Sequence, residues 1–194
     1  MTGELSPDDR IFGVANLTVG QFWAWAYSDI LSNRNRSIFA EFLVGAALGV
    51  LEKPRVEWDA VDLRYHGKGI EVKSAAYRQS WTHDNPSKIL FRIGESLGWD
   101  AATNTFAVER IRSADCYVFC LYSETEAIHA REHLLDVNFW QFYVLSTSDV
   151  TRHFGKQKSI ALSRFKHIKL QPVGYSSLRS SVEAVLQDLE MGNE

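Results

Sequence analysis

Two segments near the N-terminus repeat apolar residues with the period of an α-helix. The first helix is predicted over residues 18–31, with Thr18 as its N-cap. The second is predicted over residues 36–49, where Gly49 is suited to end it. The apolar positions that define these two helices are Phe22, Trp23, Ala26, Tyr27, Ile38, Phe39, Phe42, Leu43, Ala46 and Ala47.

Residues 56–74 contain two stretches of alternating apolar and polar side chains on either side of residues 66–67, a pattern that predicts a β-hairpin. Pairing outward from a two-residue turn, His66-Gly67, places Asp62 directly opposite Glu71. Because side chains alternate between the two faces of a strand, one face is expected to join the core. The side chains expected on that core face are Val61, Leu63, Ile70 and Val72.

The rest of the chain mixes strand and helix patterns. Residues 88–93 alternate as a strand, while residues 116–122 and 139–145 are continuous apolar runs typical of strands buried on both faces. Residues 75–81 are expected to begin a helix, and residues 180–189 to close the chain as another. The inward positions of the closing helix are Val182, Val185, Leu186 and Leu189. This order predicts the α/β class, with a mixed β-sheet flanked by helices.

Length, charge and cysteine content narrow the class of protein. A chain of 194 residues is long enough for one domain and short for two. Its net charge of −3 argues against coating nucleic acid by bulk attraction, although a local basic groove is compatible with it. Cys116 and Cys120 are predicted to be buried apolar side chains in a reducing compartment. An N-terminus unlike a signal peptide, and no apolar run of about 18 residues, predict a cytoplasmic protein without a membrane partner.

The second face of the hairpin carries Asp62, Glu71 and Lys73. Like charges on directly opposed residues destabilise a strand pair, so a hairpin selected for stability alone should avoid this arrangement. A cation between the two carboxylates explains it, and Mg²⁺ prefers such oxygen ligands. Glu41, on the preceding helix, is a further candidate ligand. The plainer interpretation is a surface hairpin in which Lys73 merely screens the two acids.

The run Asp62-(x)8-Glu71-Val72-Lys73, preceded by a helix bearing Glu41, resembles the restriction-endonuclease-like superfamily, the PD-(D/E)XK nucleases. The resemblance implies a restriction-endonuclease-like core of order α-β-β-β-α-β. That core would cover about residues 36–146, with residues 147–194 packed on it as a C-terminal extension of one nuclease-like domain 1–194.

What the resemblance implies for function is Mg²⁺-dependent hydrolysis of DNA by an endonuclease of restriction, defence or repair, with Mn²⁺ able to substitute. Asp62, Glu71 and the Val72 carbonyl would hold the metal, and Glu41 would contact it directly or through water. Lys73 would orient or help to deprotonate the attacking water. DNA is then the partner, and a homodimer is left open.

The aspartate that serves as the strand acid is not decided by the resemblance, because no proline precedes either candidate. Cross-strand counting favours Asp62, since Asp59 lies three residues earlier and should project to the opposite side. A bulge near Ala60 would reverse that choice. Asp59 also has a structural role open to it, as an acceptor of backbone hydrogen bonds where the strand begins.

Residues that follow the Glu-x-Lys strand have two interpretations each. Gln79 stands where some relatives place a polar catalytic residue, and a solvated glutamine is the plainer alternative. Tyr77 and Trp81 either stack on bases or pack in the core.

Residues 151–170 contain several Lys and Arg and no acid, so they form either a solvated surface or a strip that contacts phosphates. Lys156 and Lys158 are candidate nucleic-acid contacts there, and Arg34 and Arg36, just ahead of Glu41, are further candidates.

Other catalytic classes find little support in the chain. His129 and His133 have helical i, i+4 spacing, but the residues between them do not form the H-E-x-x-H arrangement of a zinc protease. No Walker loop, GxGxxG or GxSxG motif occurs. The rival to a nuclease is a non-catalytic nucleic-acid-binding or assembly protein that keeps the same fold.

Overall fold

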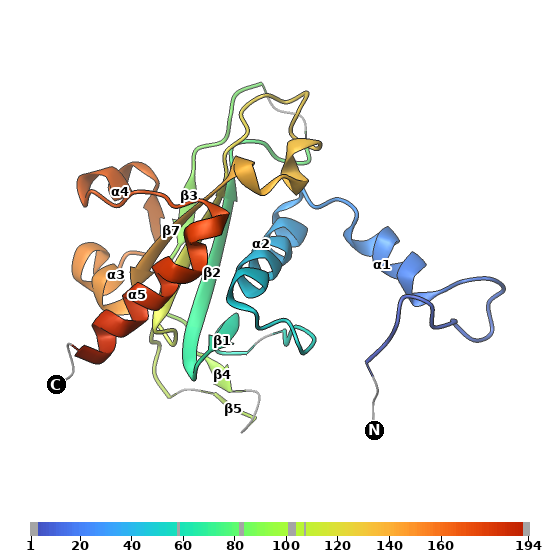
Figure 1. The fold of residues 1–194 in the computed structure, drawn as a ribbon, viewed down its shortest axis with the longest axis horizontal. Coiled ribbons are helices and arrows are strands. Elements are labelled where there is room, and N and C mark those ends of the chain that lie inside the picture. The colour runs from blue at the N-terminus through green and yellow to red at the C-terminus, as the bar shows by residue number, and fades with distance from the viewer. Residues whose placement is uncertain (1–3, 58, 82–83, 101–103, 107, 192–194) are drawn as a thin grey trace.

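A mixed four-stranded sheet, in the order β1-β2-β6-β7, forms the centre of the computed structural model (Figure 1). β1 (Leu63–Tyr65) is antiparallel to β2 (Lys68–Ala76), β2 is parallel to β6 (Cys116–Tyr122), and β6 is antiparallel to β7 (Trp140–Ser146). The residues described by the structure are 4–57, 59–81, 84–100, 104–106 and 108–191. The fold is therefore α/β, with helices on the sheet as the sequence predicts.

Helices cover both faces of this sheet and divide the core in two. On one face, α2 (Asn33–Leu48) and α5 (Leu178–Met191) contribute to a cluster that includes Val44, Ile70 and Val182. On the other face, α3 (Thr147–Phe154) and α4 (Ser163–His167) contribute to a cluster around Phe119 and Phe165. The shorter elements are β3 (Leu90–Arg92), β8 (Ser159–Ala161), β4 (Trp99–Asp100), β5 (Thr105–Phe106), η1 (His133–Leu135), η2 (Val137–Phe139) and η3 (Tyr175–Ser177).

The two continuous apolar runs are buried strands, as predicted. Every residue of β6 is buried, and most of β7 is too. Cys116 and Cys120 are free, fully buried and belong to the same core cluster, which confirms that they share one side of the strand. Burial raises the pKa of the Cys116 thiol to about 12, so it behaves as a small apolar side chain.

Side chains at their ends set the limits of the two N-terminal helices. Thr18 caps α1 (Val19–Tyr27) in a capping box with Gln21, and Gly49, at φ 75°, ends α2 in the left-handed conformation. α1 does not join the core, because none of its residues is buried and Trp25 is 84% exposed. Figure 1 shows α1 extending away from the sheet and its helices.

The hairpin forms in the predicted register. His66 and Gly67 both have positive φ, 49° and 79°, which is the backbone that a tight two-residue hairpin turn requires. Leu63 pairs with Ile70, so Asp62 and Glu71 are the next residues outward.

Two expected elements are absent from the described residues. No strand precedes β1 after α2, and no helix follows β2 before β6, so the order α-β-β-β-α-β is not reproduced. Residues 75–81 do not begin a helix because β2 continues along β6, with Ala75 opposite Leu121 and Ala76 opposite Tyr122. Of the helices described, none combines the length and apolar character that crossing a membrane requires.

Candidate functional site

Asp62 and Glu71 meet where the hairpin opens away from its turn. Asp62 precedes β1, and its Oδ2 accepts a hydrogen bond of 2.7 Å from the backbone N–H of Val72. The side chain therefore takes the place that a backbone carbonyl of a longer β1 would have on β2. This contact holds Asp62 at the flank of the Glu-x-Lys strand, as the predicted register requires.

Glu71 and Lys73 form an ion pair on the face of β2 opposite Val72. Register places Glu71 beside Tyr117 and Lys73 beside Phe119, both part of the core under α3 and α4. Burial raises the pKa of Glu71, the charge of Lys73 opposes this rise, and the charge of Asp62 adds to it. The carboxylate is thus held in a site that favours its neutral form unless more positive charge is present.

Glu41 projects from α2 toward the same group of charges and is only 7% exposed. Arg55 binds it through two hydrogen bonds, one of them from Nη2 to Oε1 at 3.1 Å. Burial raises the pKa of Glu41, the bond from Arg55 lowers it, and the charge of Asp62 raises it further. Arg55 was not identified from the sequence, where nothing in a loop of mixed charge distinguishes it.

A cavity of about 580 Å³ opens beside the hairpin acids. Its acidic lining is Glu57, Asp59, Asp62 and Glu71, and its largest apolar side chains are Leu97, Trp99 and Phe106. The apolar wall belongs to the segment around β4 and β5, which the sequence pattern did not identify as part of a site. A cavity with acids on one wall and aromatic rings on the other can accept a cation together with a flat, partly apolar ligand.

Asp59 lies in this cavity too, so the expectation that it projects to the opposite side is wrong. Strand alternation does not apply there, because residues 60–62 form bends rather than an extension of β1. Asp59 accepts the N–H of Ala60 at 2.8 Å and forms an ion pair with Arg64 at 3.3 Å. These contacts match the structural role that was open to it.

Arg36 and Gln79 belong to a separate network, and neither fits the role expected from the sequence. Arg36 is 3% exposed and donates to the Leu31 carbonyl at 2.9 Å and to Oε1 of Gln79 at 3.0 Å. Gln79 also donates to the Ala76 carbonyl at 3.1 Å. Such burial does not suit Arg36 as a phosphate contact, and its bonds turn Gln79 to α2 instead of the cavity acids. Arg34, by contrast, is exposed.

The two aromatic candidates separate in the same way. Tyr77 is partly buried against the core under α3 and α4, whereas Trp81 is 54% exposed and lines a second cavity of about 240 Å³. Neither lines the cavity that holds the hairpin acids.

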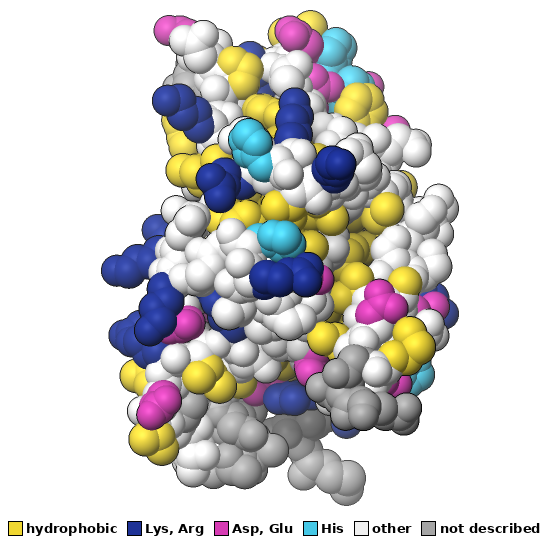
Figure 2. Space-filling view, turned by 90° about the vertical axis from the view of Figure 1, so that its left-hand side faces the viewer, with side chains coloured by type: hydrophobic (Ala, Val, Ile, Leu, Met, Phe, Trp, Pro, Cys, Tyr) yellow, Lys and Arg dark blue, Asp and Glu magenta, His cyan; other side chains and the backbone are white. Residues whose placement is uncertain are grey.

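The Lys and Arg side chains of residues 151–170, the segment that contains α3, β8 and α4, are exposed. Figure 2, which looks onto the side carrying these helices, shows Lys and Arg side chains with histidines beside them. The N–H of Ile93 donates to the Lys158 carbonyl at 2.9 Å, and Ser96 of the cavity wall follows shortly after. The segment and the cavity are therefore joined through β3 and β8.

The oxygen donors of the hairpin fit a hard divalent cation in kind and number, since Mg²⁺ needs only one or two carboxylates beside water and phosphate. In the described part of the chain, Glu41, Asp62 and Glu71 do not form a group whose ligand atoms all lie within 4.8 Å. Each has an internal partner, namely Arg55, the Val72 N–H and Lys73. An ion would therefore compete with these partners as it drew the acids together.

No family model matches the sequence, and no curated protein matches it. The assignment of function rests on the charges and distances of the hairpin and its cavity.

Proposed function

We propose that the chain is a Mg²⁺-dependent nuclease whose restriction-endonuclease-like centre is formed by Asp62, Glu71 and Lys73, with Glu41 behind them. The single observation that carries the proposal is the hairpin register, which puts Asp62 beside the Glu-x-Lys strand, where Asp62 and Glu71 both line one cavity. A protein that needed only a stable hairpin would not keep two carboxylates there, because they destabilise each other.

The residues of the centre would divide the work between binding and proton transfer. Asp62 and Glu71, with the Val72 carbonyl, would hold the ion, and Glu41 would contact it directly or through water. When bound, Mg²⁺ would activate water and offset charge on the phosphate. The Lys73 ammonium, freed from Glu71, would orient the attacking water and stabilise negative charge on the phosphate oxygens.

The cavity and the basic segment would position the nucleic acid. Trp99 and Phe106 offer ring faces on which a base can stack, since such stacking tolerates any base. Lys156 and Lys158 offer charges for phosphates, on the same side of the sheet as Glu71 and Lys73. DNA is the favoured substrate, on the strength of the resemblance of the motif.

Cleavage of plasmid DNA, linear DNA, single-stranded DNA and RNA in Mg²⁺ or Mn²⁺ tests the proposal. We expect the wild type to cut at least one of them and to stop in EDTA, and Glu71→Ala and Lys73→Ala each to remove the activity with the fold intact. Lys68→Ala is the matched control, since Lys68 lies on the same strand and pairs with Glu190 instead. Cutting that persists in both variants would place the activity elsewhere.

The alternative is a non-catalytic nucleic-acid-binding or assembly protein with the same fold. It is favoured by the ion pairs, because Glu41, Asp59 and Glu71 each have a basic partner, as in a structural network. Binding to DNA that neither requires a divalent ion nor leads to cleavage would support it.

A further inference from the structure

A second cluster of ligating side chains lies in the turn between β6 and β7. Among the described residues, His129, Glu132 and His133 form the one group of His, Cys, Asp or Glu whose ligand atoms all lie within 4.8 Å of one another. We propose that this turn binds Zn²⁺ through these three side chains. The site is separate from the hairpin acids and does not depend on the proposed nuclease function.

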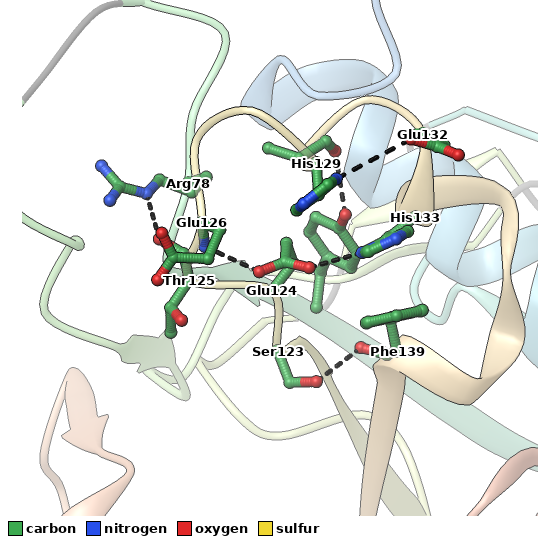
Figure 3. A network of polar contacts seen from close by, with 11 residues as sticks. Arg78, Ser123, Glu124, Thr125, Glu126, His129, Glu132, His133 and Phe139 are labelled. Atoms are coloured by element: carbon green, nitrogen blue, oxygen red, sulfur yellow. Dashed lines mark hydrogen bonds and ion pairs between the residues drawn. The ribbon is translucent and has the colours of Figure 1, made fainter.

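The backbone of the turn sets the three side chains close together. The N–H of His133 donates to the carbonyl of His129 at 3.0 Å, a helical hydrogen bond that makes residues three and four apart neighbours. His129 Nδ1 lies 3.8 Å from Glu132 Oε2. The two imidazole rings are stacked with centroids 4.9 Å apart. Figure 3 shows all three side chains in this one turn, with Glu124 beneath His133.

Glu124 fixes the orientation of His133. Its Oε2 lies 2.5 Å from His133 Nδ1, and its Oε1 accepts the backbone N–H of Glu126 at 2.6 Å. A carboxylate only accepts hydrogen bonds, so Nδ1 of a neutral His133 carries the proton and Nε2 keeps its lone pair. This is the carboxylate–histidine arrangement that commonly supports a metal-bound imidazole.

The turn is also held rigidly against the sheet. Phe139 stacks on the His133 ring with centroids 3.9 Å apart, and Ser123 Oγ donates to the Phe139 carbonyl at 2.8 Å. Tyr122 and Trp140 donate to carbonyls of the turn at 2.9 Å and 3.0 Å. An ion would therefore find His133 already oriented, while the more exposed side chains of His129 and Glu132 would have to order around it.

The donor set selects the metal. Two imidazoles and one carboxylate suit Zn²⁺ and its neighbours in the first transition row, whereas Mg²⁺ and Ca²⁺ prefer oxygen alone. The second cavity is lined by other side chains of the same turn, among them Ile128 and Arg131, and not by the three ligands. The bound ion would thus brace the β6–β7 connection and the wall of that cavity, with water in the remaining position.

Calorimetric titration of the full chain with Zn²⁺ tests the site. We expect one ion per chain and a higher melting temperature in Zn²⁺, with both effects lost in His129→Gln, whose side chain is exposed and not needed for folding. Glu124→Gln should weaken binding roughly 10- to 100-fold, as removal of a ligand-orienting group does. His153→Gln changes an exposed histidine outside the cluster and should bind as the wild type does.

Glu71→Gln separates this site from the hairpin, and it should retain full Zn²⁺ affinity. Co²⁺ should give the visible absorption of a four-coordinate site in the wild type and in Glu71→Gln, but not in His129→Gln. Undiminished Zn²⁺ binding in His129→Gln, or no binding by the wild type, would overturn the proposal. Loss of Zn²⁺ binding in Glu71→Gln alone would overturn it equally, by moving the ion to the hairpin.

Discussion

Glu71 carries the largest electrostatic cost of the candidate centre, because its carboxylate is partly buried near the charge of Asp62 and only Lys73 offsets both effects. Its pKa in the folded protein lies above the ordinary value, mainly through burial. Folding therefore favours the neutral form. The stabilisation from this group is complete at pH values below the unfolded pKa and is lost as the pH rises through the folded pKa.

Replacing Glu71 by a neutral residue should remove this loss of stability at higher pH. Without metal and at neutral pH, we expect Glu71→Gln to melt at a higher temperature than the wild type. At about pH 4, where the glutamate is largely protonated, the two should melt at similar temperatures. Thermal unfolding in EDTA across this range measures the effect. Glu52→Gln, at an exposed site, should show no such pattern. A lower melting temperature for Glu71→Gln at neutral pH would mean that its ion pair with Lys73 outweighs burial.

Among individual residues, three members of the candidate site could be predicted from the sequence and others could not. Asp62, Glu71 and Lys73 could be grouped because strand alternation and a two-residue turn relate them locally. Arg55 and Trp99 could not, since a loop brings Arg55 to the site and the short strand β4 brings Trp99, and the position of both depends on packing. Arg36 was a candidate nucleic-acid contact because it lies just ahead of Glu41, but it is buried, and four hydrogen-bond partners offset the cost of that burial.

The hairpin is the element on which the centre depends, and its turn is strained for any residue but glycine at position 67. A Cβ on Gly67 would meet no atom within 4 Å, so a substitution there acts through the backbone at φ 79° and not through a clash. We expect Gly67→Ala to destabilise the protein by about 1 kcal/mol. Chemical denaturation would measure the effect.

The same variant tests whether the register is set by the whole sheet or by the turn alone. β2 pairs with β6 over seven residues, which should hold Glu71 and Lys73 in place even when the turn is weakened. Metal-dependent cleavage per folded molecule should therefore stay close to that of the wild type. A loss of cleavage much larger than the loss of folded protein would show that the turn itself maintains the site.

Elements defined by local patterns were predicted well, and those decided by distant contacts were not. Thr18, Gly49 and the buried run of β6 follow from capping and burial, which the nearby sequence records. The length of β2 depends on β6, whose paired residues lie 46 positions further along the chain. The apolar periodicity of α1 predicts a helix, but it does not predict that none of the residues of that helix is buried.

At the scale of the whole molecule, the basic segment of residues 151–170 has to be reconciled with a net charge of −3. The two are compatible because the basic residues gather in one exposed segment, in α3, in α4 and in the loop before β8, and that segment is bonded through Lys158 to Ile93 of the chain leading to the cavity wall. If the segment contacts DNA, a double variant Lys156→Gln, Lys158→Gln should weaken binding to all sequences alike. The slope of log affinity against log salt should fall by roughly 0.9 for each duplex phosphate that the variant no longer neutralises.

Binding measured over a range of salt concentrations, in Ca²⁺ or EDTA to prevent cleavage, decides this point. Lys68→Gln serves as the comparison, because Lys68 is not part of residues 151–170 and is instead paired with Glu190 of α5. An unchanged slope in the double variant would show that residues 151–170 are solvated surface that does not contact DNA. An equal change of slope in Lys68→Gln would show a general effect of charge.

The central claim, that Asp62 and not Asp59 joins Glu71 in holding the ion, is tested most directly by comparing DNA cleavage in Mg²⁺ and Mn²⁺ by Asp62→Ala and Asp59→Ala. Both aspartates line the cavity, but Asp59 is bound to Ala60 and Arg64, while Asp62 lies against the Glu-x-Lys strand. We expect Asp62→Ala to lose all metal-dependent cleavage and Asp59→Ala to keep much of it. The reverse result would contradict the account and transfer the metal to Asp59.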